Sequence, residues 1–114
     1  MDTVIQPPPS LNDKNTFIAY HIHCKHKDTG VEFTVLKRYN DFLNLKKSLS
    51  KSASSAALKS MASFPPKLVF GNKKEENIEK RRFNLQVWLD SVLTNDELHE
   101  NPDVFAFFHT DTPT

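Results

Sequence analysis

The stretch TFIAYHIHCKHKDTGVEFTVLKRYNDF, residues 16–42, decides the fold of this chain of 114 residues. Apolar and polar residues alternate in its first half, so that Tyr20, Ile22 and Cys24 fall on one face of a strand. After the turn signal Asp28-Thr29-Gly30, the alternation resumes. Two alternating runs around such a turn predict an antiparallel β-hairpin.

From residue 40 onward the apolar spacing lengthens to three or four residues, which predicts helices. They are expected at residues 40–51 and 72–93, with a last helix that begins at Pro102 after the capping residue Asn101. Thr94 or Asn95 either ends the long helix or starts a short one through residues 97–100. Residues 50–63 contain six serines and no acidic residue, and we predict a mobile loop whose alanines permit transient helix. The element order predicts an α+β fold in which a small antiparallel sheet packs against helices.

The length and a hydrophobic content of 38% fit one domain with a single core. We expect an N-terminal arm at residues 1–15 that could contribute a first strand near Val4–Ile5. A globular domain follows at 16–109, and a frayed tail at 110–114. No stretch of about 20 apolar residues is present, as a membrane-spanning helix would require. The single Cys24 excludes an internal disulfide and fits a reducing, cytoplasmic compartment.

The net charge of +1 averages over unlike segments. Residues 14–82 contain all 15 Lys and Arg against six acidic residues, which gives this segment +9, whereas residues 83–114 carry −6. Such segregation is typical of a basic surface that meets an anionic partner, although solvated charges without a partner would give the same count.

Several classes of function find no support in the sequence. There is no glycine-rich phosphate loop, nucleophile elbow or zinc-protease motif, so we expect no enzyme and no cofactor. His21 and His23 point to one face of the predicted strand while Cys24 and His26 point to the other, so no metal site is expected. The pI is near 7.9, and the sequence has no zinc finger, basic zipper or aromatic-plus-glycine RNA-binding signature. Nucleic-acid binding is therefore not expected.

The long predicted helix carries an apolar stripe, formed by Ile78, Leu85, Trp88, Leu89 and Val92. Arg81 lies inside this stripe, where an uncompensated charge is costly, whereas Arg82 lies at its edge. Phe83 and Val87 form a smaller patch on the opposite side, predicted to make a minor contact with the domain.

Four residues suit a phosphorylated cyclic headgroup: Arg38, Tyr39, Lys67 and Arg81. The arginine fork recognises phosphates and hydroxyls, lysine supplies a point charge, and a tyrosine ring packs against a sugar-like ring. Alternatively, Arg38 and Arg81 could pair with Asp41 or Glu79, and Tyr39 could belong to the core.

These motifs resemble those of the PX (phox-homology) domains of sorting nexins and related trafficking proteins. The resemblance covers about residues 16–109 and rests on three motifs: Lys37-Arg38-Tyr39-Asn40-Asp41-Phe42, Phe64-Pro65-Pro66-Lys67, and Ile78-Glu79-Lys80-Arg81-Arg82-Phe83-Asn84-Leu85 followed by Trp88-Leu89. It implies a three-stranded antiparallel sheet against a helical subdomain of three to four helices, with a proline-containing extended loop.

The resemblance also implies a ligand, phosphatidylinositol 3-phosphate. Arg38 matches the residue that contacts the 3-phosphate, Tyr39 the ring beneath the inositol, Lys67 the contact of the 1-phosphate, and Arg81 the residue that holds the 4- and 5-hydroxyls. The chain departs from the family in one respect, because no two prolines are three apart. SH3 binding through a P-x-x-P motif is therefore not expected.

The function implied is recruitment to the cytosolic face of endosomal membranes, as a peripheral module in protein sorting and transport. Leu58, Met61 and Lys59 are candidate membrane contacts on the loop beside the pocket, although Leu58 and Met61 could instead pack on the domain. The alternative function is a protein-interaction module with weak or unselective lipid binding, which would use the acidic C-terminal part and the Phe105–Phe108 helix.

Overall fold

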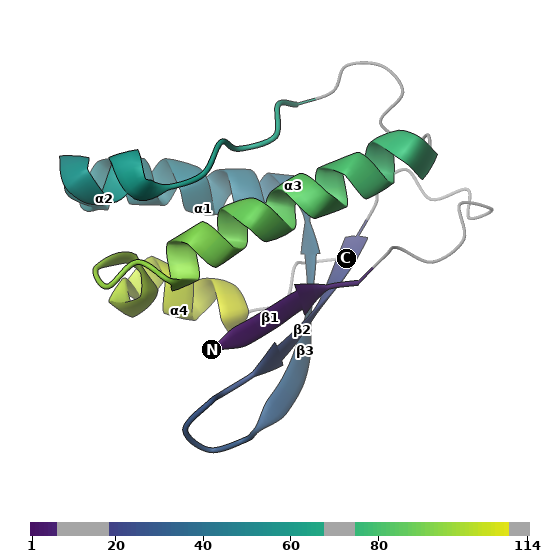
Figure 1. Ribbon diagram of the computed structural model, residues 1–114, viewed down its shortest axis with the longest axis horizontal. Coiled ribbons are helices and arrows are strands. Elements are labelled where there is room, and N and C mark those ends of the chain that lie inside the picture. Colours follow the sequence, from purple (N-terminus) through teal and green to yellow (C-terminus); the bar gives the residue numbers. More distant parts are fainter. Residues whose placement is uncertain (7–18, 68–74, 110–114) are drawn as a thin grey trace.

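The computed structural model describes residues 1–6, 19–67 and 75–109. Three strands and four helices with one short 3-10 helix succeed one another along these segments (Figure 1). In chain order they are β1 (Asp2–Ile5), β2 (Ala19–Lys25), β3 (Glu32–Arg38), α1 (Tyr39–Ser52), α2 (Ser55–Ser60), α3 (Glu75–Leu93), η1 (Leu98–Glu100) and α4 (Pro102–Phe108). The predicted α+β class with a three-stranded sheet is confirmed.

The sheet is antiparallel with the order β1-β2-β3. In the central hairpin Ile22 lies opposite Val35, and both side chains are buried. Gly30 closes the turn with a φ of 73°, a conformation in which a side chain would be strained. The predicted hairpin is therefore confirmed, as is the first strand, since Ile5 of β1 lies opposite Ile22.

The outer edge of β1 is covered by side chains of α3. The Ile5 amide N–H donates to Gln86 Oε1 at 2.6 Å, and Gln86 Nε2 donates to the Thr3 carbonyl at 3.2 Å. Arg82 Nη1 donates to the Ile5 carbonyl at 2.9 Å. An unpaired strand edge would expose such groups to another chain, so α3 substitutes for a fourth strand.

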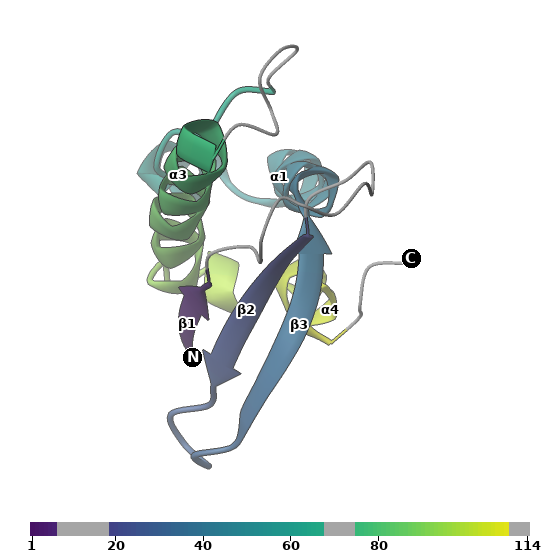
Figure 2. The ribbon, with the colours of Figure 1, turned by 90° about the vertical axis from the view of Figure 1, so that its right-hand side faces the viewer.

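The core lies between the sheet and the helices, and Figure 2 shows α1 and α3 side by side at one end of the sheet. Trp88, Leu89 and Leu85 of α3 are fully buried, which confirms the predicted stripe. On α1, Phe42 meets Tyr20 of β2 and Phe107 of α4 at ring-centroid distances of 6.4 and 5.1 Å. These aromatic contacts join three elements distant in sequence.

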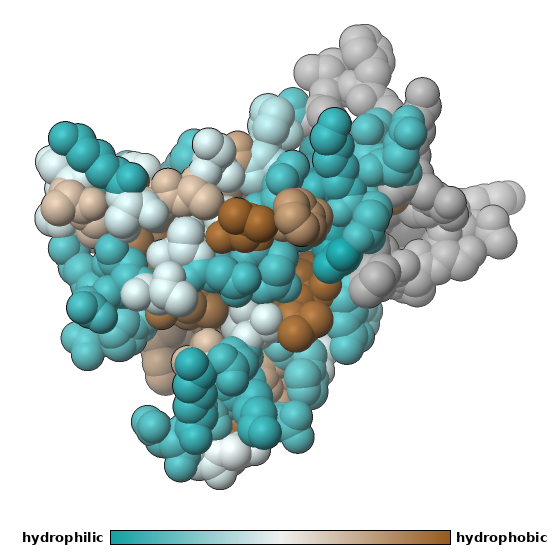
Figure 3. Space-filling model, in the orientation of Figure 1, coloured by the Kyte–Doolittle hydropathy of each residue, from teal (hydrophilic) through white to brown (hydrophobic). Residues whose placement is uncertain are grey.

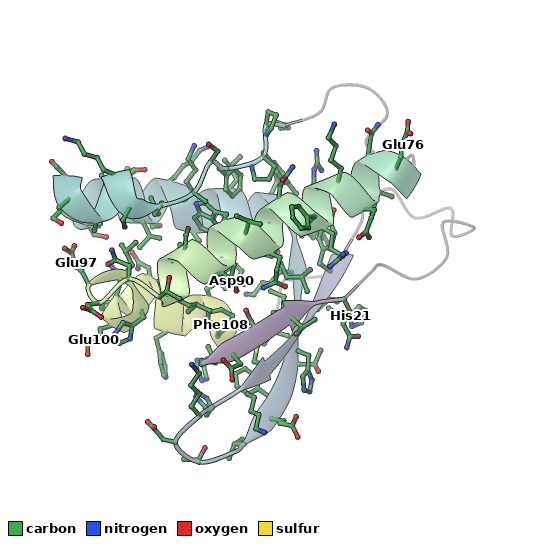
Figure 4. All side chains as sticks on the ribbon, viewed as in Figure 1. His21, Glu76, Asp90, Glu97, Glu100 and Phe108 are labelled. Atoms are coloured by element: carbon green, nitrogen blue, oxygen red, sulfur yellow. The ribbon has the colours of Figure 1, made fainter. Side chains whose placement is uncertain are left out.

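The prediction of a mobile loop over residues 50–63 is wrong. Helix α1 continues to Ser52, and α2 follows almost at once. Ser54 caps α2 by accepting from the Ala57 amide at 3.1 Å, and Glu97 accepts from the Ser54 amide and hydroxyl at 2.8 and 2.6 Å. Ala57 is buried beneath the helix. Figure 4 shows Glu97 beside α2, so a contact remote in sequence fixes this segment.

One side-chain expectation also needs correction. Phe83 and Val87 are expected to touch the domain, but 60% and 42% of their surfaces are exposed. On α4, Phe105 is 64% exposed, whereas Phe107 is buried. At about 100° per residue, the buried arc of α4 runs from Phe107 to Phe108 and leaves Phe105 outside it.

Some expectations fall on residues that the structure does not describe. They are the arm beyond residue 6, the first residues of the hairpin at 16–18, the start of the long helix at 72–74, and the tail at 110–114.

We predict that Gln86→Leu lowers the free energy of unfolding by about 1–3 kcal/mol, because two β1 backbone groups lose their partner. Chemical denaturation measures this change. Lys47→Leu, which adds the same side chain at an exposed position of α1, serves as the control. Equal stability of the two variants would contradict the role of Gln86.

Candidate functional site

An arginine and a tyrosine from different helices form the centre of the candidate site. The Arg81 guanidinium of α3 lies over the Tyr39 ring, with its central carbon 4.2 Å from the ring centroid. Tyr39 is the first residue of α1 and is 8% exposed. The contact is a cation–π interaction that orients the guanidinium.

Tyr39 also fixes the proline-containing segment. Its hydroxyl donates to the Pro65 carbonyl at 2.7 Å. Phe64 packs between the Tyr39 ring, with centroids 5.5 Å apart, and the edge of Trp88 at 5.1 Å. Residues 61–67 therefore run back along α3 toward its N-terminal end, as Figure 1 shows.

A pocket of about 170 Å³ opens between this segment and α3. Its lining residues are Pro65, Pro66, Asn77, Lys80, Arg81 and Asn84. Two cations and two amides thus face a small cavity walled by prolines. This combination suits an anionic ligand that also carries hydroxyl groups.

The charge of Arg81 is not neutralised by a carboxylate within the described residues, where the ion pairs involve other side chains. Its polar neighbours are phenols. Burial raises the pKa of Tyr20 and Tyr39, and the positive charge of Arg81 opposes that rise in both. Both phenols stay neutral at physiological pH, so neither places a negative charge beside the guanidinium.

The adjacent Arg82 has a different environment. It forms a bidentate ion pair with Glu79, one turn earlier, and also binds the β1 backbone. The hydrogen bond from Arg82 lowers the pKa of the Glu79 carboxyl. Arg82 is therefore engaged in holding the fold. Glu79, offered above as a partner of Arg81, pairs with Arg82 instead.

The other two predicted binding residues, Arg38 and Lys67, are neighbours in sequence of Tyr39 and Pro66 but do not line the pocket. Arg38 is the last residue of β3 and precedes Tyr39, and its amide N–H donates to Asp41 Oδ2 at 2.8 Å. That bond makes Asp41, at the third position of α1, the side chain that accepts from the N-cap backbone. Lys67 is exposed and follows Pro66 directly.

Sequence reasoning missed three residues of the pocket, Asn77, Lys80 and Asn84. Together with Arg81 they recur at intervals of three or four residues, the spacing of one helix face. That period was the available signal. Lys37 was also missed as a core residue: it is 4% exposed and lies over the Phe107 ring at 4.7 Å.

The candidate membrane contacts lie on α2 and at its end. Leu58 is half-buried, Lys59 is exposed, and Met61 packs against the core. Asn95 Nδ2 donates to Ser60 Oγ, and the Ala62 amide donates to Ser91 Oγ. Arg81 is ten residues before Ser91, so α2 lies roughly 15 Å along α3 from the pocket centre. The expected position beside the pocket is therefore wrong.

Within residues 1–6, 19–67 and 75–109, no helix has both the length and the apolar character needed to cross a bilayer. In the same segments, no three His, Cys, Asp or Glu side chains gather as a metal site would need. Cys24 is fully buried, which raises the pKa of its thiol to about 11.

The family model described as PX domain matches residues 25–111. The chain belongs to the PX domain family. PX domains are phosphoinositide-binding modules, and their partners are membranes that contain these lipids. The resemblance inferred from the three motifs is thereby confirmed.

Among curated proteins, the PX chain is 35% identical over 83 residues to the serine/threonine-protein kinase Sgk3 of Rattus norvegicus and to that of Mus musculus. The alignment covers 72% of this chain and 16% of each kinase. The chain thus corresponds to a small part of these relatives, and their kinase activity belongs to them as whole proteins.

Two solved structures share the fold. A designed CISK-PX domain superposes with a TM-score of 0.75 at 24% identity, over 96% of this chain and all of the other. The PX domain of mouse SNX19, solved with a bound sulphate ion, gives a TM-score of 0.67 at 17% identity over 97% of both chains.

We predict that Tyr39→Phe, which removes the bond to the Pro65 carbonyl, lowers the free energy of unfolding by about 0.5–1.5 kcal/mol. Because the ring and its contact with Arg81 remain, hydrogen exchange should speed up mainly around residues 61–67. Unchanged exchange there would show that Phe64 packing alone holds the segment.

Proposed function

We propose that this PX domain binds phosphatidylinositol 3-phosphate at the Arg81 pocket and attaches peripherally to the cytosolic face of endosomal membranes, in protein sorting. The observation that carries the proposal is the orientation of Arg81. Its guanidinium is stacked on Tyr39 beside the pocket and has no carboxylate partner among the described residues. A charge prepared in this way favours an anionic ligand with hydroxyl groups.

Each of the four residues has a role in this proposal. Arg38 contacts the 3-phosphate, Lys67 contacts the 1-phosphate, and Arg81 holds the 4- and 5-hydroxyls. Tyr39 supports the inositol ring. Tyr39 is only 8% exposed, so its main contribution is to hold Arg81 and Pro65 in position.

Lysines of α1 and α2 add attraction that does not depend on the lipid headgroup. Lys46 lies 5.4 Å from the Phe64 ring centroid, next to the proline-containing segment. Lys47, Lys51 and Lys59 are exposed on α1 and α2. Each contributes about 1 kcal/mol where it approaches an anionic surface. Lys73, which belongs to the same basic segment, lies outside the described residues.

We predict that Arg38→Ala and Arg81→Gln each weaken binding to liposomes containing phosphatidylinositol 3-phosphate by about 10-fold or more. A hydrogen bond to a charged group contributes about 1.5–3 kcal/mol. Sedimentation with liposomes measures the loss, and Lys25→Ala, which removes one exposed charge from β2, is the control.

Wild-type affinity in both arginine variants would overturn the site. A titration of wild-type protein against liposomes of each phosphoinositide tests selectivity. Equal binding to all of them would favour the alternative, a protein-interaction module. On α4 the exposed aromatic side chain available to such a module is Phe105, since Phe107 and Phe108 are buried.

Membrane contact through α2 is a separate part of the proposal, with Lys59 at its centre and Leu58 and Met61 beside it. We predict that Lys59→Ala weakens binding to anionic liposomes by up to about fivefold, with or without the 3-phosphate lipid, because one surface charge is lost. Flotation of the two liposome types measures this. Undiminished binding to both would remove α2 from the membrane contact.

A further inference from the structure

The outer face of α3 carries apolar side chains that the domain does not cover. Phe83 is 60% and Val87 is 42% exposed, one helical turn apart. Figure 3 shows apolar surface over α3 on this face and again over β1, where Val4 is 56% exposed. Exposed apolar side chains gathered in this way mark an interaction surface.

Two charged residues extend this face into a seam. Lys80, Phe83, Val87 and Asp90 are spaced three, four and three residues apart, so at 100° per residue they fall within an arc of about 80°. We call these four residues the α3 seam. This spacing is the one by which two helices pack side by side. Lys80 and Asp90 are exposed, and neither forms an ion pair within the described part of the chain.

We propose that the α3 seam binds the α3 seam of a second copy of this chain, with the two helices antiparallel and Leu85 at the centre. In that register Phe83 packs against Val87 of the partner subunit, and Lys80 pairs with Asp90 of the partner subunit. The two-fold symmetry repeats each contact, as an isologous interface requires.

The charges select this orientation. A parallel pair in register would place Lys80 against the same lysine and Asp90 against the same aspartate, which is repulsive at both ends. Glu76 extends the seam at its N-terminal end, and the antiparallel register places it against the partner's Thr94, so no like charges meet. Figure 4 shows Glu76 and Asp90 toward opposite ends of α3.

The direction of the seam argues against the bilayer as its occupant. The centre of the pocket-lining side of α3, between Lys80 and Arg81, is turned by about 90° around the helix axis from the centre of the seam, and Lys80 lies where the two meet. When the pocket faces a membrane, the seam therefore points sideways along the surface. A second protein bound to the same membrane surface could therefore contact the seam.

The right angle between the seam and the pocket also determines where the two pockets of the dimer point. This part of the inference rests on the proposed function. The two-fold axis of an antiparallel pair is perpendicular to both helices and to the line between them, so it lies along the direction of the pockets. Both pockets then open to one side, about 15 Å apart along the helix axis. Two headgroups bound at once would raise the affinity for a membrane without any new lipid contact.

Disulfide trapping tests the register. Under mild oxidation, Phe83→Cys mixed with Val87→Cys should give a cross-linked heterodimer in excess of either variant alone. The matched control mixes Phe83→Cys with Phe105→Cys, an equally exposed position on α4. Cys24 is buried and stays out of the reaction. Equal yields from the test and control mixtures would overturn the proposal.

Sedimentation velocity tests the charge pairs. Asp90→Lys and Lys80→Asp should each weaken self-association, and the double variant that exchanges both charges should restore it. A double variant no better than the single ones would contradict the pairing.

A comparison of wild type with Phe83→Ser separates this proposal from the proposed function. A soluble inositol 1,3-bisphosphate should bind both proteins equally, whereas liposomes with the 3-phosphate lipid should bind wild type several-fold more tightly. Equal binding to liposomes overturns the cooperation between pockets. If neither protein binds the soluble headgroup but the cysteine variants still cross-link, the proposed function is overturned and the proposed dimer is not.

Discussion

The position of Tyr39 is the constraint on which the rest of the site depends. This residue directly follows the hairpin and begins α1, and its side chain contacts Arg81 through the ring and the Pro65 carbonyl through the hydroxyl. Three segments distant in sequence therefore meet at one buried aromatic residue. Without it, the proline-containing segment would be tied to α3 by the packing of Phe64 on Trp88 and by the hydrogen bond from the Ala62 amide to Ser91, both in the C-terminal half of the helix. The Pro65 side of the pocket would lose its hydrogen bond to the Tyr39 hydroxyl.

Two adjacent arginines of α3 have different partners because of helix geometry. Arg81 and Arg82 differ in direction by about 100°, and this angle decides their partners. Arg82 meets the edge of β1 and the carboxylate of Glu79, so its charge stabilises the fold. Arg81 meets phenols that stay neutral and no carboxylate among the described residues, and on this ground we propose it as a ligand contact. A shift of one residue in the helix would exchange these roles.

Helix α3 organises the molecule because each of its faces has a separate partner. Leu85, Trp88 and Leu89 enter the core, and Gln86 with Arg82 covers the edge of β1. The pocket lies on the flank opposite β1, and the fourth face carries the exposed Phe83 and Val87. A helix with apolar residues on opposite sides has a weak overall amphipathic pattern. Sequence periodicity alone therefore predicted correctly which residues of α3 are buried in the core, but not that Phe83 and Val87 stay exposed on its outer face.

The sequence by itself determined the elements whose signals are local. The alternation around Gly30 gave the hairpin, the apolar stripe gave α3, and Asn101 before Pro102 gave the start of α4. Tertiary structure decided what depends on remote partners. Glu97 and Asn95 make residues 55–60 a helix, although their own composition resembles a loop. Which apolar residues stay exposed, and which arginine remains without a carboxylate, follow from packing, because burial belongs to the folded surface and is not encoded by any single residue.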